Sequence, residues 1–349
     1  MSFKTEHRKL ILVALLMLVS AGSSAAQTDD PQLVQLRRQL ALRYMEPASH
    51  LLLGKYYLQK GDRLQAFYIL EYARRTFPEA QFNQAFQMHF GGPRSKTVSR
   101  TAEVLMNKAI ELERAGDSKG AEDYFIKAAE QAAGSVEIQS WVGRYFFKTR
   151  GDNLRALPFY LNAYFLNPHA YETEFVESRI RTINYEEATL RYRQLAQKDV
   201  PLEEILKEPN PTVLVLALEQ VTENWQPTYL KPVLSAMAHD DEQVRWLCTE
   251  ALQKHVDQSF DQDLKVLLQH RDLRIRGLAA YVAAHLWKQR SLDLLRNMLN
   301  DEAQLLRFDA ISSLARDGGN EGRKILIARR PRETNPELRK LIDQAIAGK

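Results

Sequence analysis

The chain has 349 residues, which is enough for about two domains of average size. Charged residues make up 26% of it and apolar residues 45%, as is ordinary for a soluble globular chain. The formal net charge of +4 comes without a block of like charges, which argues against a nucleic-acid-binding surface, and the single cysteine, Cys248, excludes an intramolecular disulfide.

The first 26 residues have the layout of a secretory signal peptide. A basic start leads into an apolar run from Leu10 to Val19, and small residues follow up to Ala26. The run is ten residues long, whereas a membrane span needs about 20. We therefore predict cleavage after Ala26 and a periplasmic or secreted protein without an integral membrane span; an uncleaved anchor stays open as the alternative.

A short pattern recurs three times in the first half of the chain, as "KGDRLQA", "AGDSKGA" and "RGDNLRA". In each copy a Gly-Asp pair is followed by alanine five residues after the glycine, and a second alanine comes seven residues later. Glycine tolerates the left-handed conformation that ends a helix, and aspartate can cap the next one. Alanine fits where two helices approach most closely. The pattern predicts helical hairpins, with these structural positions: Gly61 and Ala66, Gly116 and Ala121, Gly151 and Ala156.

These hairpins resemble the tetratricopeptide repeat, a helix-turn-helix unit of about 34 residues. The resemblance covers residues 47–78, 102–133 and 136–168, with a large apolar residue four positions after the first alanine each time. The third copy has one residue more between its glycines than the first, so its first helix is expected to end differently.

An insertion separates the first hairpin from the second. Gly61 and Gly116 are 55 residues apart, whereas Gly116 and Gly151 are 35 apart. Within the insertion Phe82, Phe86 and Phe90 fall on one helical stripe. We favour an additional packed helix here over a loop that docks a partner.

A second period, of 31 residues, begins near Asn210. It relates Val213, Val244, Ile275 and Leu306, and likewise Ala217, Cys248, Ala279 and Ala310. Asparagine or aspartate recurs as a candidate N-cap at Asn210, Asp241, Asp272 and Asn335, and in the fourth copy Asp301 lies further back. This series resembles HEAT repeats, in particular the short HEAT-like class named for phycobilisome lyases, over residues 210–349.

Two features of this series have more than one interpretation. Cys248 occupies an alanine-type position, so we predict a buried spacer in preference to a nucleophile. Arg245, Arg276 and Arg307 form a ladder that would bind an acidic partner or polymer, or would hold each repeat together. We favour the structural interpretation.

No catalytic signature is found in the sequence. It contains no His-Glu-x-x-His, no phosphate-binding glycine loop and no Gly-x-Ser-x-Gly elbow, and its histidines lack metal-ligand spacing. We predict that the protein is not an enzyme and uses neither a metal nor another cofactor.

The expected fold is all-α: a right-handed α-solenoid with tetratricopeptide-like hairpins in residues 27–200 and HEAT-like repeats in residues 201–349. The resemblance implies a scaffold or adaptor that binds a protein or peptide, in envelope assembly or secretion. The candidate partner-binding residues are Lys55, Gln59, Arg144 and Lys148. Leu51 stands where a carboxylate-clamp lysine would be, so capture of a C-terminal carboxylate is not expected.

Two alternatives remain open at this stage. One is a peptidoglycan-binding or polysaccharide-binding module. The other is an enzyme subunit such as a HEAT-like lyase. The partner and the oligomeric state do not follow from the residues.

Overall fold

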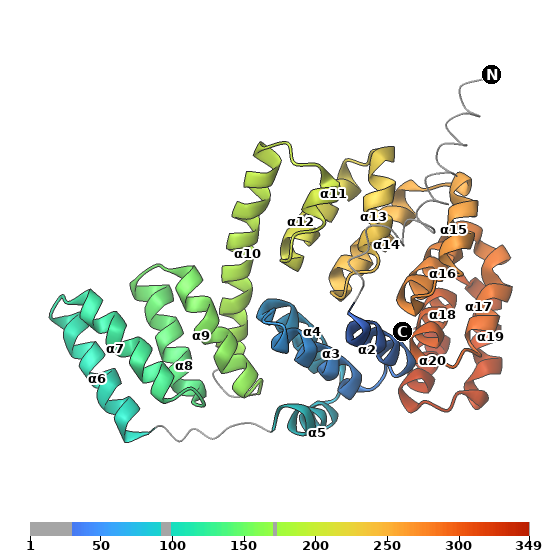
Figure 1. Cartoon of the computed structure of the whole chain (residues 1–349). Helices are drawn as coiled ribbons and strands as arrows, with labels where there is room; N and C mark the ends of the chain where they lie inside the picture. Colours follow the sequence, from blue (N-terminus) through green and yellow to red (C-terminus); the bar gives the residue numbers. More distant parts are fainter. Residues whose placement is uncertain (1–29, 92–98, 170–172, 349) are drawn as a thin grey trace. The chain divides into compact units, whose positions relative to one another are not determined.

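The computed structural model describes residues 30–91, 99–169 and 173–348, and every regular element in these ranges is helical, so the all-α prediction is confirmed (Figure 1). No helix in the described ranges has the length and apolarity needed to cross a membrane. The predicted signal peptide, residues 1–26, lies outside the described residues.

The longer helices, in chain order, are α2 Pro31–Leu42, α3 Pro47–Gln59, α4 Arg63–Thr76, α5 Glu79–Phe90, α6 Arg100–Arg114, α7 Ser118–Gln131, α8 Val136–Arg144, α9 Asn153–Leu166, α10 Thr173–Gln197, α11 Leu202–Ile205, α12 Pro211–Glu223, α13 Leu230–Ala236, α14 Glu242–His255, α15 Asp261–Leu267, α16 Leu273–Trp287, α17 Leu292–Met298, α18 Gln304–Asp317, α19 Gly319–Arg329 and α20 Pro336–Ala347. The short elements are η1 Tyr145–Thr149, η2 Pro227–Tyr229, η3 Gln258–Phe260, η4 Lys288–Ser291 and η5 Arg330–Arg332.

The chain folds into two compact units. Among the described residues, the middle unit lies within Gly54–Glu219, and the split unit combines residues 30–53 with residues 220–348. These units are defined by packing. The boundary predicted between residues 200 and 201 marks a change of repeat type, and it stays a prediction.

In the middle unit, the repeated Gly-Asp pairs lie at the turns between paired helices. Gly61, Gly116 and Gly151 have positive φ angles of 83°, 83° and 63°, which glycine adopts without strain. Each following aspartate accepts a hydrogen bond from a backbone amide in the first turn of the next helix, as predicted. The alanines that follow, Ala66, Ala121 and Ala156, are fully buried.

The extra residue of the third hairpin is accommodated in its first helix. Helix α8 continues into η1, a π-helix, where the backbone amide of Arg150 bonds to the carbonyl of Tyr145. A π-helix holds one additional residue per turn, so the turn at Gly151 keeps its geometry. The expectation that this helix ends differently is confirmed.

Within the middle unit, α4 packs on the end of the row of helices α6 to α10. Figure 1 shows α6 to α10 following one another, and α4 contacts α9 and α10. The rings of Phe67 and Tyr164 meet edge to face, with centroids 4.8 Å apart. Arg74 and Arg75 both form ion pairs with the buried Glu177 of α10. This packing differs from stacking in chain order, because α5 separates the first hairpin from the second in sequence.

The phenylalanine stripe of the insertion lies on α5. Phe82 and Phe86 are buried and stack on each other, with ring centroids 5.9 Å apart. Phe90 continues the stack at 4.9 Å from Phe86. The prediction of an additional packed helix is confirmed; residues 92–98 of the same insertion lie outside the described ranges.

In the split unit, a longer second helix follows each short first helix, and α14, α16, α18 and α20 pack in a row. Asp241, Asp272 and Asn335 cap α14, α16 and α20, and Asn210 caps α12. All four caps were predicted. In the fourth copy Asp301 accepts a hydrogen bond from the amide of Ala303, the residue before α18, so it orders the loop and α18 itself has no side-chain cap.

Helix α2 completes the split unit by packing on α16 and α18. Two nitrogens of Arg37 donate to the two carboxylate oxygens of Asp240, each at 2.8 Å. Arg274 also pairs with Asp240, so this buried acid is shared by two arginines. The Tyr44 ring lies 5.3 Å from that of Phe308. The N-terminal helix therefore belongs structurally with the C-terminal repeats.

Candidate partner-binding surface

The four residues predicted to bind a partner have different surroundings in the middle unit. Lys55 donates from Nζ to the carbonyl oxygen of His89 at 2.8 Å, so its charge caps the end of α5. Gln59 is exposed at the end of α3. Arg144 and Lys148 are exposed at the end of α8 and in η1. Within the described ranges, no hydrogen bond, ion pair or ring contact links the first two residues to the last two.

Arg144 belongs to a group of arginines and aromatic rings that we call the Arg144–Arg179 cluster. Its guanidinium carbon lies 5.5 Å from the centre of the Trp141 ring and 4.9 Å from that of Phe175. Arg179 lies 4.9 Å from the same Phe175 ring. Such distances are typical of cation–π contacts, which orient guanidinium groups without neutralising them. The cluster consists of Trp141, Arg144, Phe147, Tyr160, Phe175 and Arg179.

The sequence positions the cluster through a close approach of two helices. A side chain at Gly143 would come within 2.9 Å of the Tyr160 ring, so the glycine lets that ring lie directly on the backbone of α8. In the first hairpin the equivalent glycine, Gly54, makes the same room for Leu70. The bulkier residue at Tyr160 brings a hydroxyl group to the cluster.

The cluster carries two positive charges that no side chain in the described part of the chain pairs with. Neither Arg144 nor Arg179 has an ion pair with any part of the chain that the structure describes. Tyr160 is fully buried and its hydroxyl group has no hydrogen-bond partner, and the Nε of Arg179 has none either. Burial raises the pKa of Tyr160 to about 12, although Arg179 and Arg144 act against this shift, so the hydroxyl keeps its proton. The donors that an anionic group can reach are those of the exposed Arg144 and the half-buried Arg179, and the buried Tyr160 hydroxyl lies behind them.

Trp141 gives the cluster an apolar border, because 48% of this large side chain is exposed. A ligand that fits here would present a carboxylate to the arginines and an apolar side chain to the indole ring. Aromatic and arginine side chains are the types that most often anchor protein partners.

Of the cluster, sequence reasoning found only Arg144. Arg179 was missed, although it follows Arg144 by 35 residues, the same interval that separates Gly116 from Gly151. Extending the first period into α10 would have identified it. Tyr160 was noted only as a large apolar residue, and its unpaired hydroxyl group follows from packing.

The arginine ladder of the second series has structural contacts. Each member donates to the backbone carbonyl oxygen six residues before it, at 2.7 Å for Arg245, 2.9 Å for Arg276 and 2.8 Å for Arg307. Arg339 makes the same contact with Glu333. These bonds tie the start of each second helix to the loop before it, which supports the structural interpretation of the ladder.

Two other kinds of site considered from the sequence are a reactive cysteine and a metal site. Cys248 is fully buried, and burial raises the pKa of its thiol far above the usual range, so no reactive thiolate forms. Within the described residues, no group of three or more histidine, cysteine, aspartate or glutamate side chains is arranged to hold a metal ion.

No protein-family model matches the chain, and no curated protein shows significant similarity to it.

Proposed function

We propose that this chain is an exported, periplasmic or secreted, non-catalytic adaptor that binds a protein or peptide partner through the Arg144–Arg179 cluster. The observation that carries the proposal is the pair of arginines that share the Phe175 ring and have no ion pair with a described residue. The partner presents an acidic side chain within its chain, next to an apolar residue that covers Trp141. A bulk polyanion is disfavoured, because such ligands require longer runs of positive charge.

The helical hairpins supply the setting for this function. In the proposal they form an α-solenoid of tetratricopeptide-like units followed by HEAT-like units. Each repeat is too small to bury its own apolar face, so neighbours cover it and leave side chains of the outer faces free for a partner. Envelope assembly or secretion is the process in which such an adaptor acts.

Site-specific photocrosslinking in intact cells tests the proposal. A photoreactive amino acid replaces Lys148, which is exposed beside the cluster, and a control carries it at Lys119, which is exposed on α7. We expect one discrete crosslinked partner from position 148 and not from position 119, in the envelope or secreted fraction. A chain confined to the cytoplasm contradicts the export part of the proposal.

Charge variants then connect the crosslink to the cluster. We expect Arg144→Glu and Arg179→Gln each to abolish the crosslink and to weaken binding of the purified partner about tenfold or more, with an affinity that falls as salt rises. Arg114→Glu makes the same charge change as Arg144→Glu, at the exposed end of α6, and serves as its matched control. Equal binding by all three variants, with unchanged circular dichroism, would rule out the cluster.

A further inference from the structure

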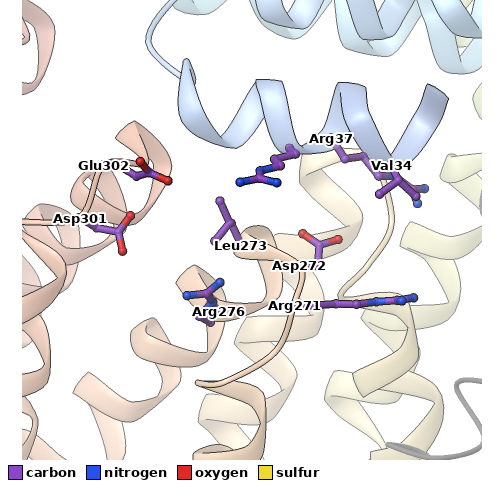
Figure 2. A pocket seen from close by; sticks show the side chains of 9 residues that line it. Val34, Arg37, Arg271, Asp272, Leu273, Arg276, Asp301 and Glu302 are labelled. Carbon is purple, nitrogen blue, oxygen red and sulfur yellow. The ribbon is translucent and has the colours of Figure 1, made fainter. Parts of the chain in front are cut away.

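The split unit contains a cavity of about 460 Å³ beside α2, at the N-terminal ends of α16 and α18 (Figure 2). This volume lies within the range of about 300–1,000 Å³ typical of small-ligand sites. Three segments distant in sequence form its wall: α2, the loop leading into α16 and the loop leading into α18. The lining residues are Val34, Arg37, Arg38, Arg271, Asp272, Leu273, Arg276, Asp301 and Glu302.

Two of the charged lining residues are already engaged. Arg37 is bound by both carboxylate oxygens of Asp240. Asp272 receives Arg274 and caps α16. These two side chains hold the wall of the cavity in place. The remaining charged lining residues are the ones available to bind a ligand.

Three arginines keep unused donors at the cavity. Arg38 and Arg271 make no ion pair with the described part of the chain. Arg276 uses its Nε for the carbonyl oxygen of His270, at 2.9 Å, and its two terminal nitrogens have no partner in the same residues. A carboxylate entering the cavity would meet guanidinium groups on this side.

The acidic residues of the cavity, Asp301 and Glu302, lie in the loop before α18. One carboxylate oxygen of Asp301 accepts a hydrogen bond from the amide of Ala303, at 2.8 Å. Glu302 is exposed, and its carboxylate is unpaired in the described ranges. Figure 2 shows these two acids on one side and Arg271 on the other, with Leu273 and Arg276 between them. Asp301 and Glu302 thus lie at one end of the cavity and Arg271 at the other, beside Asp272, whose carboxylate already receives Arg274.

We propose that this cavity binds a short zwitterionic peptide, with its free amino group at Asp301 and Glu302 and its free carboxylate at Arg271 and Arg276. A ligand of one sign only would face a like charge at one end of the cavity. A roughly spherical space of this volume is about 10 Å across, which matches about three extended residues. Leu273 suits an apolar side chain in the middle position, and Val34 lies at the edge of the cavity on α2.

Titration calorimetry with Ala-Leu-Ala and its end-blocked forms tests the assignment. Acetylation removes the ammonium charge and amidation removes the carboxylate, and neither changes the residues of the peptide. We expect the free peptide to bind and each blocked form to bind about tenfold more weakly or worse, because charge-assisted hydrogen bonds are lost. Absence of binding at about 10 mM free peptide, or equal binding of the blocked forms, would overturn the proposal.

Two variants assign the ends of the peptide. With Arg271→Gln we expect the preference for the free carboxylate over the amide to disappear, while the preference for the free amine stays. With Glu302→Gln the pattern should reverse. Lys265→Gln, an exposed change on α15 outside the cavity, should keep both preferences. Retention of both preferences in the first two variants would contradict the assignment; because these residues belong to the split unit, that result would leave the middle-unit proposal untouched.

Discussion

His50 is a titratable residue in the interior of the split unit. Its side chain is 3% exposed, and its Nε2 lies 2.9 Å from the carbonyl oxygen of Tyr44. Burial lowers the pKa of His50 to about 4, which outweighs the opposing effect of Glu242. The folded protein therefore holds this imidazole neutral at a pH at which the unfolded chain would protonate it.

The sign of the resulting pH dependence follows directly. The neutral histidine favours folding at pH values above its unfolded pKa of about 6.5, and this contribution falls as the pH drops toward about 4. The loss amounts to about 3 kcal/mol for a shift of this size. Asp309 changes the stability in the opposite direction. Burial raises its pKa, so lowering the pH protonates this carboxylate and removes the cost of keeping it charged in the folded protein.

We predict that His50→Gln removes part of the stability loss of the split unit between pH 6.5 and 4, and that His239, whose pKa burial also lowers to about 4, causes a similar part. Glutamine keeps a donor for the Tyr44 carbonyl oxygen but does not titrate. Urea denaturation at several pH values, followed by hydrogen exchange of split-unit amides, measures the effect. A variant as sensitive to acid as the parent chain would show that other groups control this range.

At the scale of elements, the contact of α4 with α10 depends on charged side chains. Glu71 and Glu177 are buried and pair with Arg74, Arg75 and Arg181. Deleting Glu177 leaves the partly buried Arg74 without its carboxylate partner, while Arg75 and Arg181 keep Glu71. The docking of the first hairpin should therefore be sensitive to a single truncation.

We predict that Glu177→Ala lowers the free energy of unfolding of the middle unit by about 3 kcal/mol. Glu103→Ala, at an exposed position on α6, is the control and should change it by less than about 0.5 kcal/mol. Chemical denaturation of the two variants measures both values. A similar, small change in both would mean that α4 is held by its apolar contacts alone.

The elements themselves could be predicted because their signals are local. Gly61 with Asp62, or Asp272 at the start of α16, specifies a turn or cap within a few residues. The docking of α4 on α10 could not be predicted, since Arg74 and Glu177 are not at recurring positions of the repeats and lie 103 residues apart. The same limit applies to the cavity, whose wall combines Arg38 with residues of two distant loops.

For the whole molecule, the two units do not follow one another along the sequence, because the split unit combines an N-terminal stretch with a C-terminal one. Residues 30–53 supply the buried side chains of Leu40, Tyr44 and Leu51 to a unit that otherwise begins at Gln220. A fragment cut at the boundary between the two repeat types would lack this contribution. Burial of each large apolar side chain is worth about 1.5–3 kcal/mol.

We predict that fragment 211–349 is destabilised by about 5 kcal/mol relative to the same residues in the full chain. A synthetic peptide of residues 30–53 should bind it and raise its melting temperature. The same peptide with Arg37→Glu should bind more weakly, because it places a carboxylate opposite Asp240. Circular dichroism with and without the peptides measures this, and a fragment indifferent to both would refute the interdependence.

The packing of α2 on α16 and α18 also affects the order in which the two units fold. Arg37 meets a residue 203 positions later, and the amide of Met45 meets one 259 positions later. Ribosomes and export channels deliver a polypeptide from its N-terminus, so α2 stays unburied until Asp240, α16 and α18 have emerged. The middle unit is free to form during this interval. The split unit is therefore expected to fold last. Contacts between residues far apart in sequence form slowly, and its apolar side chains stay exposed for longest, so a chaperone would act mainly at this step.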